Sequence, residues 1–139
     1  MQIRRFQTID EAFVIALWQA CDLTRAWNDP HKDIARKLTV QPELFVVGIQ
    51  DNQLISSAMF GFEGHRGWVN YLAVAPAHQR KGHASTLMRW GEEALIARGC
   101  PKINLQVRSS NAAVIAFYQS LGYGIDEVTS LGKRLISDT

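Results

Sequence analysis

The segment Gln79–Ala84, with the sequence QRKGHA, has the residue types of a phosphate-binding loop. It follows an apolar run and a proline, and a helical pattern begins at its end, so we expect it to connect a strand to a helix. A helix start offers unpaired N–H groups and partial positive charge, which bind phosphate. Gly82 and Ala84 let a ligand approach the backbone, and Arg80 and Lys81 add positive charge. An ordinary basic turn before a helix has the same local sequence, so this signal is weak by itself.

Two better-known phosphate motifs do not fit this segment. A Walker loop places its Lys directly after its last Gly, whereas Lys81 precedes Gly82. A dinucleotide-binding fingerprint needs three glycines, and Gly82 has no second or third partner at the required spacing. The sequence therefore indicates an anion-binding helix start outside these two fold families.

Composition limits the class of protein. The chain has 139 residues, of which 47% are hydrophobic and 20% charged, and this predicts one globular domain spanning residues 1–139. The formal charge is only +2 and the sequence pI is about 8.7. The basic residues are scattered except for the pairs at 4–5, 36–37, 80–81 and 133–134, so we expect no nucleic-acid partner.

The two cysteines and the hydropathy pattern indicate a cellular compartment. Cys21 and Cys100 lack metal-binding spacing, so we expect small buried hydrophobic residues in a reducing compartment and no metal site. No signal-peptide pattern and no apolar run of membrane-spanning length is present, so we expect a cytoplasmic protein without a membrane partner.

Hydrophobic periodicity and turn residues predict the elements that hold the loop. Asp29 is a good helix N-cap before Pro30, and Asp51-Asn52 is a good hairpin turn. The prediction is an α/β (α+β) fold with a mixed, mostly antiparallel sheet of about six or seven strands and helices on both faces. Strands are expected at 2–6, 44–49, 54–62, 68–74 and 102–107, with two strands or one broken strand at 123–136, and helices at 9–23, 30–38, 84–98 and 111–121.

A second motif makes the chain recognisable. Residues 111–123, NAAVIAFYQSLGY, fit the pattern Asn-x-x-Ala/Val-x-x-Phe-Tyr-x-x-x-Gly-Tyr. Together with LAV-x-P at 72–76, Q-x-x-G-x-A at 79–84 and ARG at 97–99, the chain resembles the GNAT superfamily of acetyl-CoA-dependent N-acetyltransferases over roughly residues 44–123. The segments WNDP, GHRG, GCPKI and LGKRL, beginning at residues 27, 64, 99 and 131, look like those of the small bacterial YpeA-type members.

This resemblance implies how acetyl-CoA, a co-substrate, would bind. The strands at 68–74 and 102–107 splay apart, so that the pantetheine amides pair with the free backbone and the pyrophosphate lies on the loop. Asn111 is also a predicted helix N-cap, and His83 is expected to face solvent. The donor-binding residues implied are Leu72, Ala73, Val74, Gln79, Arg80, Lys81, Gly82, His83, Ala84, Asn111 and Tyr118.

The implied chemistry needs a proton acceptor and a proton donor. An amine with a pKa of about 10.4 must lose a proton before it attacks, which costs roughly 4–5 kcal/mol at pH 7. The family places a tyrosine, here Tyr118, beside the departing sulfur as acid, although a core tyrosine would show the same helical spacing. The strand position where relatives carry a glutamate holds Asn70, which cannot act as a base. Glu63, His65, or water ordered by Asn70 and Tyr71 remain as alternatives for this catalytic function.

Three functions are consistent with these residues. The first is acetyl transfer to an amine of a small molecule, peptide or protein. The second is a catalytically reduced acyl-CoA-binding regulatory module, which Asn70 motivates. The third is nucleic-acid binding, suggested only by Arg80-Lys81 and the pI. Tyr118 favours the first, because a pure binding module gains little from a proton donor. Exposed strands at 123–136 would offer an edge for a homodimer.

Overall fold

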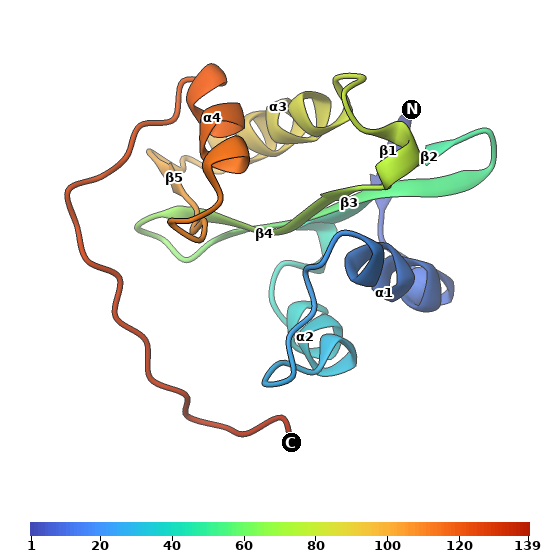
Figure 1. Cartoon of the computed structure of the whole chain (residues 1–139), viewed down its shortest axis with the longest axis horizontal. Coiled ribbons are helices and arrows are strands. Elements are labelled where there is room, and N and C mark those ends of the chain that lie inside the picture. Colours follow the sequence, from blue (N-terminus) through green and yellow to red (C-terminus); the bar gives the residue numbers. More distant parts are fainter. The chain divides into compact units, whose positions relative to one another are not determined.

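A five-stranded sheet in the order β1-β2-β3-β4-β5 organises most of the chain (Figure 1). All neighbours pair antiparallel except β4 and β5, which are parallel. The mixed, mostly antiparallel sheet predicted from the sequence is therefore confirmed. Its strands are β1 (Gln2–Arg5), β2 (Phe45–Gln50), β3 (Gln53–Phe62), β4 (Gly67–Val74) and β5 (Ile103–Asn104).

The computed structural model describes residues 1–139, which form two units. The first contains residues 1–104 and 138–139, and the second contains residues 105–137. In the first unit, α1 and α2 lie on one face of the sheet and α3 lies on the other (Figure 1). No helix has the length and apolar character needed to span a bilayer. The helices are α1 (Glu11–Ala20), α2 (Pro30–Lys37) and α3 (His83–Ile96) in the first unit and α4 (Ala112–Ser120) in the second.

The core of the first unit forms around the central strand β3. Six consecutive residues, from Ile55 to Phe60, are buried, because helices cover both faces of this strand. On the α1 side, Trp18 is fully buried and stacks near Phe45, which in turn stacks on Phe6 with ring centroids 4.3 Å apart. This aromatic group anchors α1 to the sheet.

Local signals in the sequence set the helix start of α2 and the β2–β3 hairpin. The Asp29 carboxylate accepts a hydrogen bond from the His31 N–H at 2.9 Å, and Pro30 is the first helical residue. Asp51 and Asn52 have φ angles of 50° and 61°, as a two-residue hairpin turn with two left-handed residues requires. Both predictions are confirmed.

The strands predicted at 123–136 are wrong, and β5 is shorter than the predicted strand at 102–107. The sheet therefore has five strands rather than six or seven. Apolar residues in this segment do not by themselves make a strand, because a strand forms only where a partner completes its hydrogen bonds. The edge on which the homodimer expectation relied does not form. The apolar side chains of this segment are 69% to 91% exposed: Ile125, Val128, Leu131, Leu135 and Ile136.

Gly91 allows α3 to approach β3 closely. A Cβ atom at this position would lie 2.1 Å from Cε1 of the fully buried Phe60 ring. We expect Gly91→Ala to destabilise the protein by about 1–3 kcal/mol from overpacking, offset by about 1 kcal/mol of helix propensity. Denaturant unfolding measures the net change. In a Phe60→Leu background the same substitution should cost clearly less, and an equal cost in both backgrounds would contradict this contact as the cause.

Candidate active site

Strand β4 contains a bulge that exposes part of its backbone. Its pairing with β3 shifts between Met59↔Asn70 and Ser57↔Ala73, so two β4 residues, Tyr71 and Leu72, face one β3 residue. On its other side β4 pairs with β5 only through Gly67 and Trp68. The remainder of β4, which includes the predicted donor-binding residues Leu72, Ala73 and Val74, therefore has no strand partner on that side and can pair with an extended ligand.

Tyr71, at the bulge, has a left-handed φ of 53° and is held by three contacts. Its ring stacks on Trp18 with centroids 3.8 Å apart. The Ser57 hydroxyl donates to the Tyr71 carbonyl at 3.1 Å and accepts from the Trp18 indole N–H at 2.9 Å. The Tyr71 hydroxyl donates to Asp33 Oδ2 at 2.6 Å. Burial, followed by this hydrogen bond, raises the pKa of Tyr71, so the hydroxyl stays protonated and directed to Asp33.

The loop predicted to bind phosphate leads directly into α3. Gly82 precedes the helix with a φ of 83°, and no atom lies within 4 Å of the position that a Cβ would occupy. Arg80 is also left-handed, with a φ of 62°. The Gln79 amide turns back and donates to the Val74 carbonyl at 2.9 Å, so it anchors the loop to the end of β4. The helix start is thus open to a ligand at Gly82.

Two histidines beside this loop carry buried nitrogens without a partner, His78 Nδ1 and His83 Nε2. His83 was expected to face solvent, but it is half-buried because it begins α3 next to His78, with ring centroids 6.4 Å apart. Burial is the main cause that lowers the pKa of His83, followed by nearby positive charges. Unpaired buried polar atoms are rare in folded proteins, and a polar ligand at the loop would satisfy them.

A pocket of about 180 Å³ lies between the end of α2 and strands β3 and β4. It brings together two residues predicted for the acceptor side, Glu63 and Asn70. The Lys37 ammonium donates to the Phe60 carbonyl at 2.5 Å, and burial lowers its pKa. This pocket is lined by Lys37, Val40, Gln41, Met59, Phe60, Gly61, Phe62, Glu63, Trp68 and Asn70.

The Glu63 carboxylate caps the β3–β4 turn. It accepts hydrogen bonds from the backbone N–H groups of His65, at 2.6 Å, and of Arg66. These two bonds lower the pKa of Glu63, so the carboxylate is charged and a weak base at neutral pH. This geometry favours attraction of a cationic amine over abstraction of its proton. His65 lies exposed in the same turn.

The second unit contains the remaining predicted residues. Tyr118 on α4 is 9% exposed and packs edge-to-face against Phe117 and Tyr123, with centroids 5.1 Å and 5.6 Å away. Burial raises the pKa of Tyr118 to about 12, so its phenol keeps its proton at neutral pH. Asn111 accepts from the Val114 N–H at 3.3 Å and is the N-cap that the sequence predicts. The roles of Tyr118 and Asn111 toward the donor stay predictions.

Comparison with known proteins decides the family. The model of the acetyltransferase (GNAT) family matches residues 11–123. The chain belongs to the GNAT acetyltransferase family. An acetyltransferase of Yersinia pestis is 49% identical to this GNAT protein over 138 residues, which cover 99% of this chain and 98% of the relative. The protein is therefore an acetyltransferase.

Solved structures agree with this assignment. The ribosomal-protein-S18-alanine N-acetyltransferase of Escherichia coli superposes with a TM-score of 0.72 at 28% identity, covering 87% of this GNAT protein and 76% of that chain. The PaiA N-acetyltransferase of Thermoplasma acidophilum, solved in complex with coenzyme A, superposes with a TM-score of 0.71 at 17% identity, covering 92% of each chain. At that identity the second similarity shows the fold alone.

A substitution at Gly82 tests whether the loop at residues 79–84 binds the phosphates of acetyl-CoA. We expect Gly82→Asp to lower the affinity for acetyl-CoA at least tenfold, about 1.4 kcal/mol, because it places a negative charge where the phosphates would lie. Gly82→Asn is the matched control, since Asn has nearly the same shape and also tolerates a left-handed φ but carries no charge. Titration calorimetry measures both. An unchanged affinity in the folded Asp variant would remove this loop from the donor site.

Proposed function

We propose that this GNAT protein transfers an acetyl group from acetyl-CoA directly to a primary amine, with both substrates bound at the same time. The observation that carries the proposal is the unpaired edge of β4, which ends next to an open helix start at Gly82. An extended pantetheine chain can pair with the first and a pyrophosphate can bind at the second. The PaiA N-acetyltransferase, which has the same fold, was solved in complex with coenzyme A, and this supports coenzyme A binding as part of the proposal.

The reaction involves four proton transfers at neutral pH. The acceptor ammonium first loses a proton through water, and the neutral nitrogen then attacks the thioester carbonyl carbon. A C–N bond forms as the C–S bond breaks, and the departing thiolate takes the phenol proton of Tyr118. The second proton of the nitrogen leaves to solvent, from which Tyr118 is protonated again. The raised pKa of Tyr118 keeps the phenol protonated at neutral pH and also makes it a weaker acid than an ordinary tyrosine, so the acid role rests on the motif rather than on the pKa.

The pocket between the end of α2 and strands β3 and β4 is the proposed binding site of the acceptor amine. Glu63 carries a negative charge at the pocket and attracts the ammonium group. Asn70 takes the place of a direct base by ordering the water that removes the proton. Tyr71 is a poorer choice for this water because its hydroxyl proton is directed to Asp33. The acceptor is an amine of a small molecule, a peptide or a protein.

A catalytically reduced acyl-CoA-binding module remains the second candidate function, because an asparagine stands at position 70. Release of free thiol from acetyl-CoA against a panel of amines separates the two functions. Turnover with any amine supports the transferase. Tight acetyl-CoA binding without turnover for the whole panel would support the binding module instead.

Tyr118→Phe tests the proton donor. The substitution keeps the ring packing against its neighbours and removes only the hydroxyl. We expect kcat to fall about 10²-fold or more with little change in acetyl-CoA affinity, the pattern of an interaction made mainly in the transition state. Tyr123→Phe, on the adjacent ring, is the control and should leave kcat within about twofold. Normal turnover combined with a loss of thermal stability would instead make Tyr118 a packing residue.

Glu63→Gln separates the two roles proposed for this carboxylate. The amide oxygen can still accept from the turn N–H groups, so only the charge changes. We expect KM for the amine to rise several-fold while the acidic limb of the pH profile of kcat/KM remains, because Glu63 attracts the cation. Asp51→Asn, in the distant β2–β3 hairpin, is the control for net charge. Loss of the acidic limb in the Gln variant would make Glu63 the base.

A further inference from the structure

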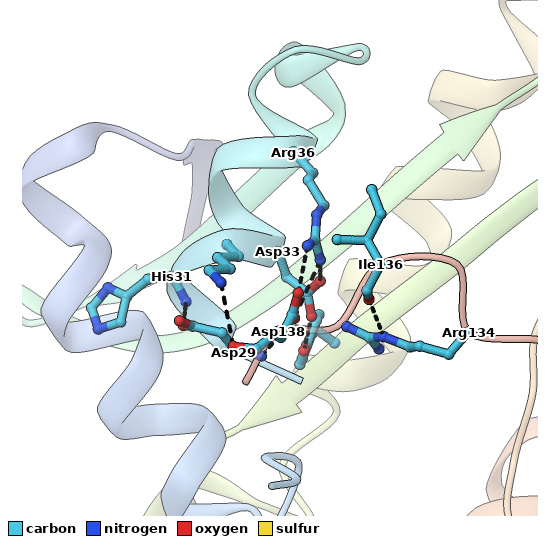
Figure 2. Close-up of polar contacts among 9 residues, drawn as sticks. Asp29, His31, Asp33, Arg36, Arg134, Ile136 and Asp138 are labelled. Atoms are coloured by element: carbon cyan, nitrogen blue, oxygen red, sulfur yellow. Dashed lines mark hydrogen bonds and ion pairs between the residues drawn. The ribbon is translucent and has the colours of Figure 1, made fainter. Parts of the chain in front are cut away.

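Asp138 is bound by the N-cap and both turns of α2 although it lies far away in the sequence. Its carboxylate accepts from the Asp29 backbone N–H at 2.8 Å and from both terminal nitrogens of Arg36, at 2.5 Å and 3.3 Å (Figure 2). The Lys32 ammonium donates to the Asp138 carbonyl at 3.3 Å. The Asp138 side chain is only 1% exposed. One charged donor, the Arg36 guanidinium, and the N–H group at a helix N-cap thus hold this carboxylate, while the Lys32 ammonium holds the backbone carbonyl of the same residue.

The same arginine continues the contacts toward the sheet. Arg36 also donates to Asp33 Oδ1 at 3.2 Å, one helical turn before it (Figure 2). The other oxygen of Asp33 accepts the Tyr71 hydroxyl at 2.6 Å. An unbroken series of hydrogen bonds therefore runs from Asp138 through Arg36 and Asp33 to the bulge in β4.

The bulge needs such contacts because Tyr71 has an unfavourable backbone conformation. A φ of 53° is uncommon for any residue with a Cβ and persists only where the surroundings enforce it. Trp18 and Ser57 hold the ring and the carbonyl of Tyr71, both from the core of the protein. Asp33 alone holds the far end of the side chain. The carboxylate thereby limits rotation of the ring and, through it, of the bulge backbone.

We propose that Asp33 is a positioning residue for acetyl transfer: it fixes Tyr71 and so the β4 bulge along which the donor binds, while Arg36 and Asp138 hold Asp33. This inference rests on the proposed function, because that function places acetyl-CoA along β4. Asp33 touches neither substrate and acts only through the Tyr71 hydroxyl. Asp138 matters because the Arg36 side chain is 47% exposed and is held by its ion pairs. Without Asp138, both guanidinium nitrogens turn to Asp33 and draw its carboxylate away from Tyr71.

A double-mutant cycle tests this series of contacts. We expect Asp33→Ala to lower kcat about tenfold and Asp138→Ala to lower it less, with the Kd of acetyl-CoA nearly unchanged. In a Tyr71→Phe background, neither substitution should lower kcat further, because the hydroxyl through which both act is absent. Asp33→Asn keeps an oxygen that accepts the Tyr71 hydroxyl and should retain most of the activity. Asp22→Ala, which removes another i,i+3 pair with an arginine, is the control.

A second readout does not depend on turnover. The amide NMR signals of Tyr71 and Leu72 should shift in Asp33→Ala and Asp138→Ala and stay in place in Asp22→Ala. Unshifted signals would overturn the proposal. So would a further loss of kcat when Asp33→Ala or Asp138→Ala is combined with Tyr71→Phe. A lower thermal midpoint with normal kcat would also overturn it. If the parent protein acetylates no amine while these signals shift as expected, the proposed function fails and the contact series to the bulge stands.

Discussion

The burial of β3 on both faces is the constraint on which the other features of the first unit depend. A strand without a solvent-facing side must have helices above and below it, and its polar side chains must find partners inside the protein. Ser57 is such a residue, with no exposed surface. A buried hydroxyl without a partner would cost about 1–3 kcal/mol, and here it bonds both to the Trp18 indole on α1 and to the Tyr71 carbonyl on β4. The core and the bulge are therefore fixed by one side chain.

The two sides of the sheet have different roles in this arrangement. On the α3 side the contact is steric, since Gly91 brings the helix against the Phe60 ring. On the α1 and α2 side, apolar packing around Trp18 is joined by directional hydrogen bonds through Ser57 and Asp33. Packing of apolar rings tolerates small sliding movements, whereas hydrogen bonds define a position to within a few tenths of an ångström. The directional contacts are on the same face as the pocket lined by Glu63 and Asn70, the proposed site of the amine.

Features that depend on neighbouring residues could be predicted from the sequence, and features that depend on distant ones could not. The Asp29 cap and the Asp51-Asn52 turn are decided within a few residues, and both are present. The segment at 123–136 was predicted to form two strands or one broken strand, but a strand also needs a partner, about which its own sequence is silent. Nothing in the sequence indicated a role for Asp33 either, since a polar residue on a short helix is usual. Asp33 is held through Arg36, and the Arg36–Asp138 contact joins residues 102 positions apart. Glu63 and Asn70 were predicted as catalytic candidates from their positions before the loop at residues 79–84. The hydrogen bonds by which Glu63 caps its turn were not foreseen.

The Val74 carbonyl, at the end of β4, accepts one hydrogen bond from Cys21 and one from the loop at residues 79–84. The Cys21 thiol donates to this oxygen at 3.2 Å, and the Gln79 amide of the loop donates to the same oxygen. Burial raises the pKa of Cys21, so little of the thiolate that reacts with electrophiles is present. Cys21 is partly exposed, so an alkylating reagent can reach it, and the adduct removes the thiol hydrogen that bonds Val74. Covalent labelling of Cys21 would therefore report on how firmly the core supports the end of β4 beneath the loop, independent of any catalytic turnover.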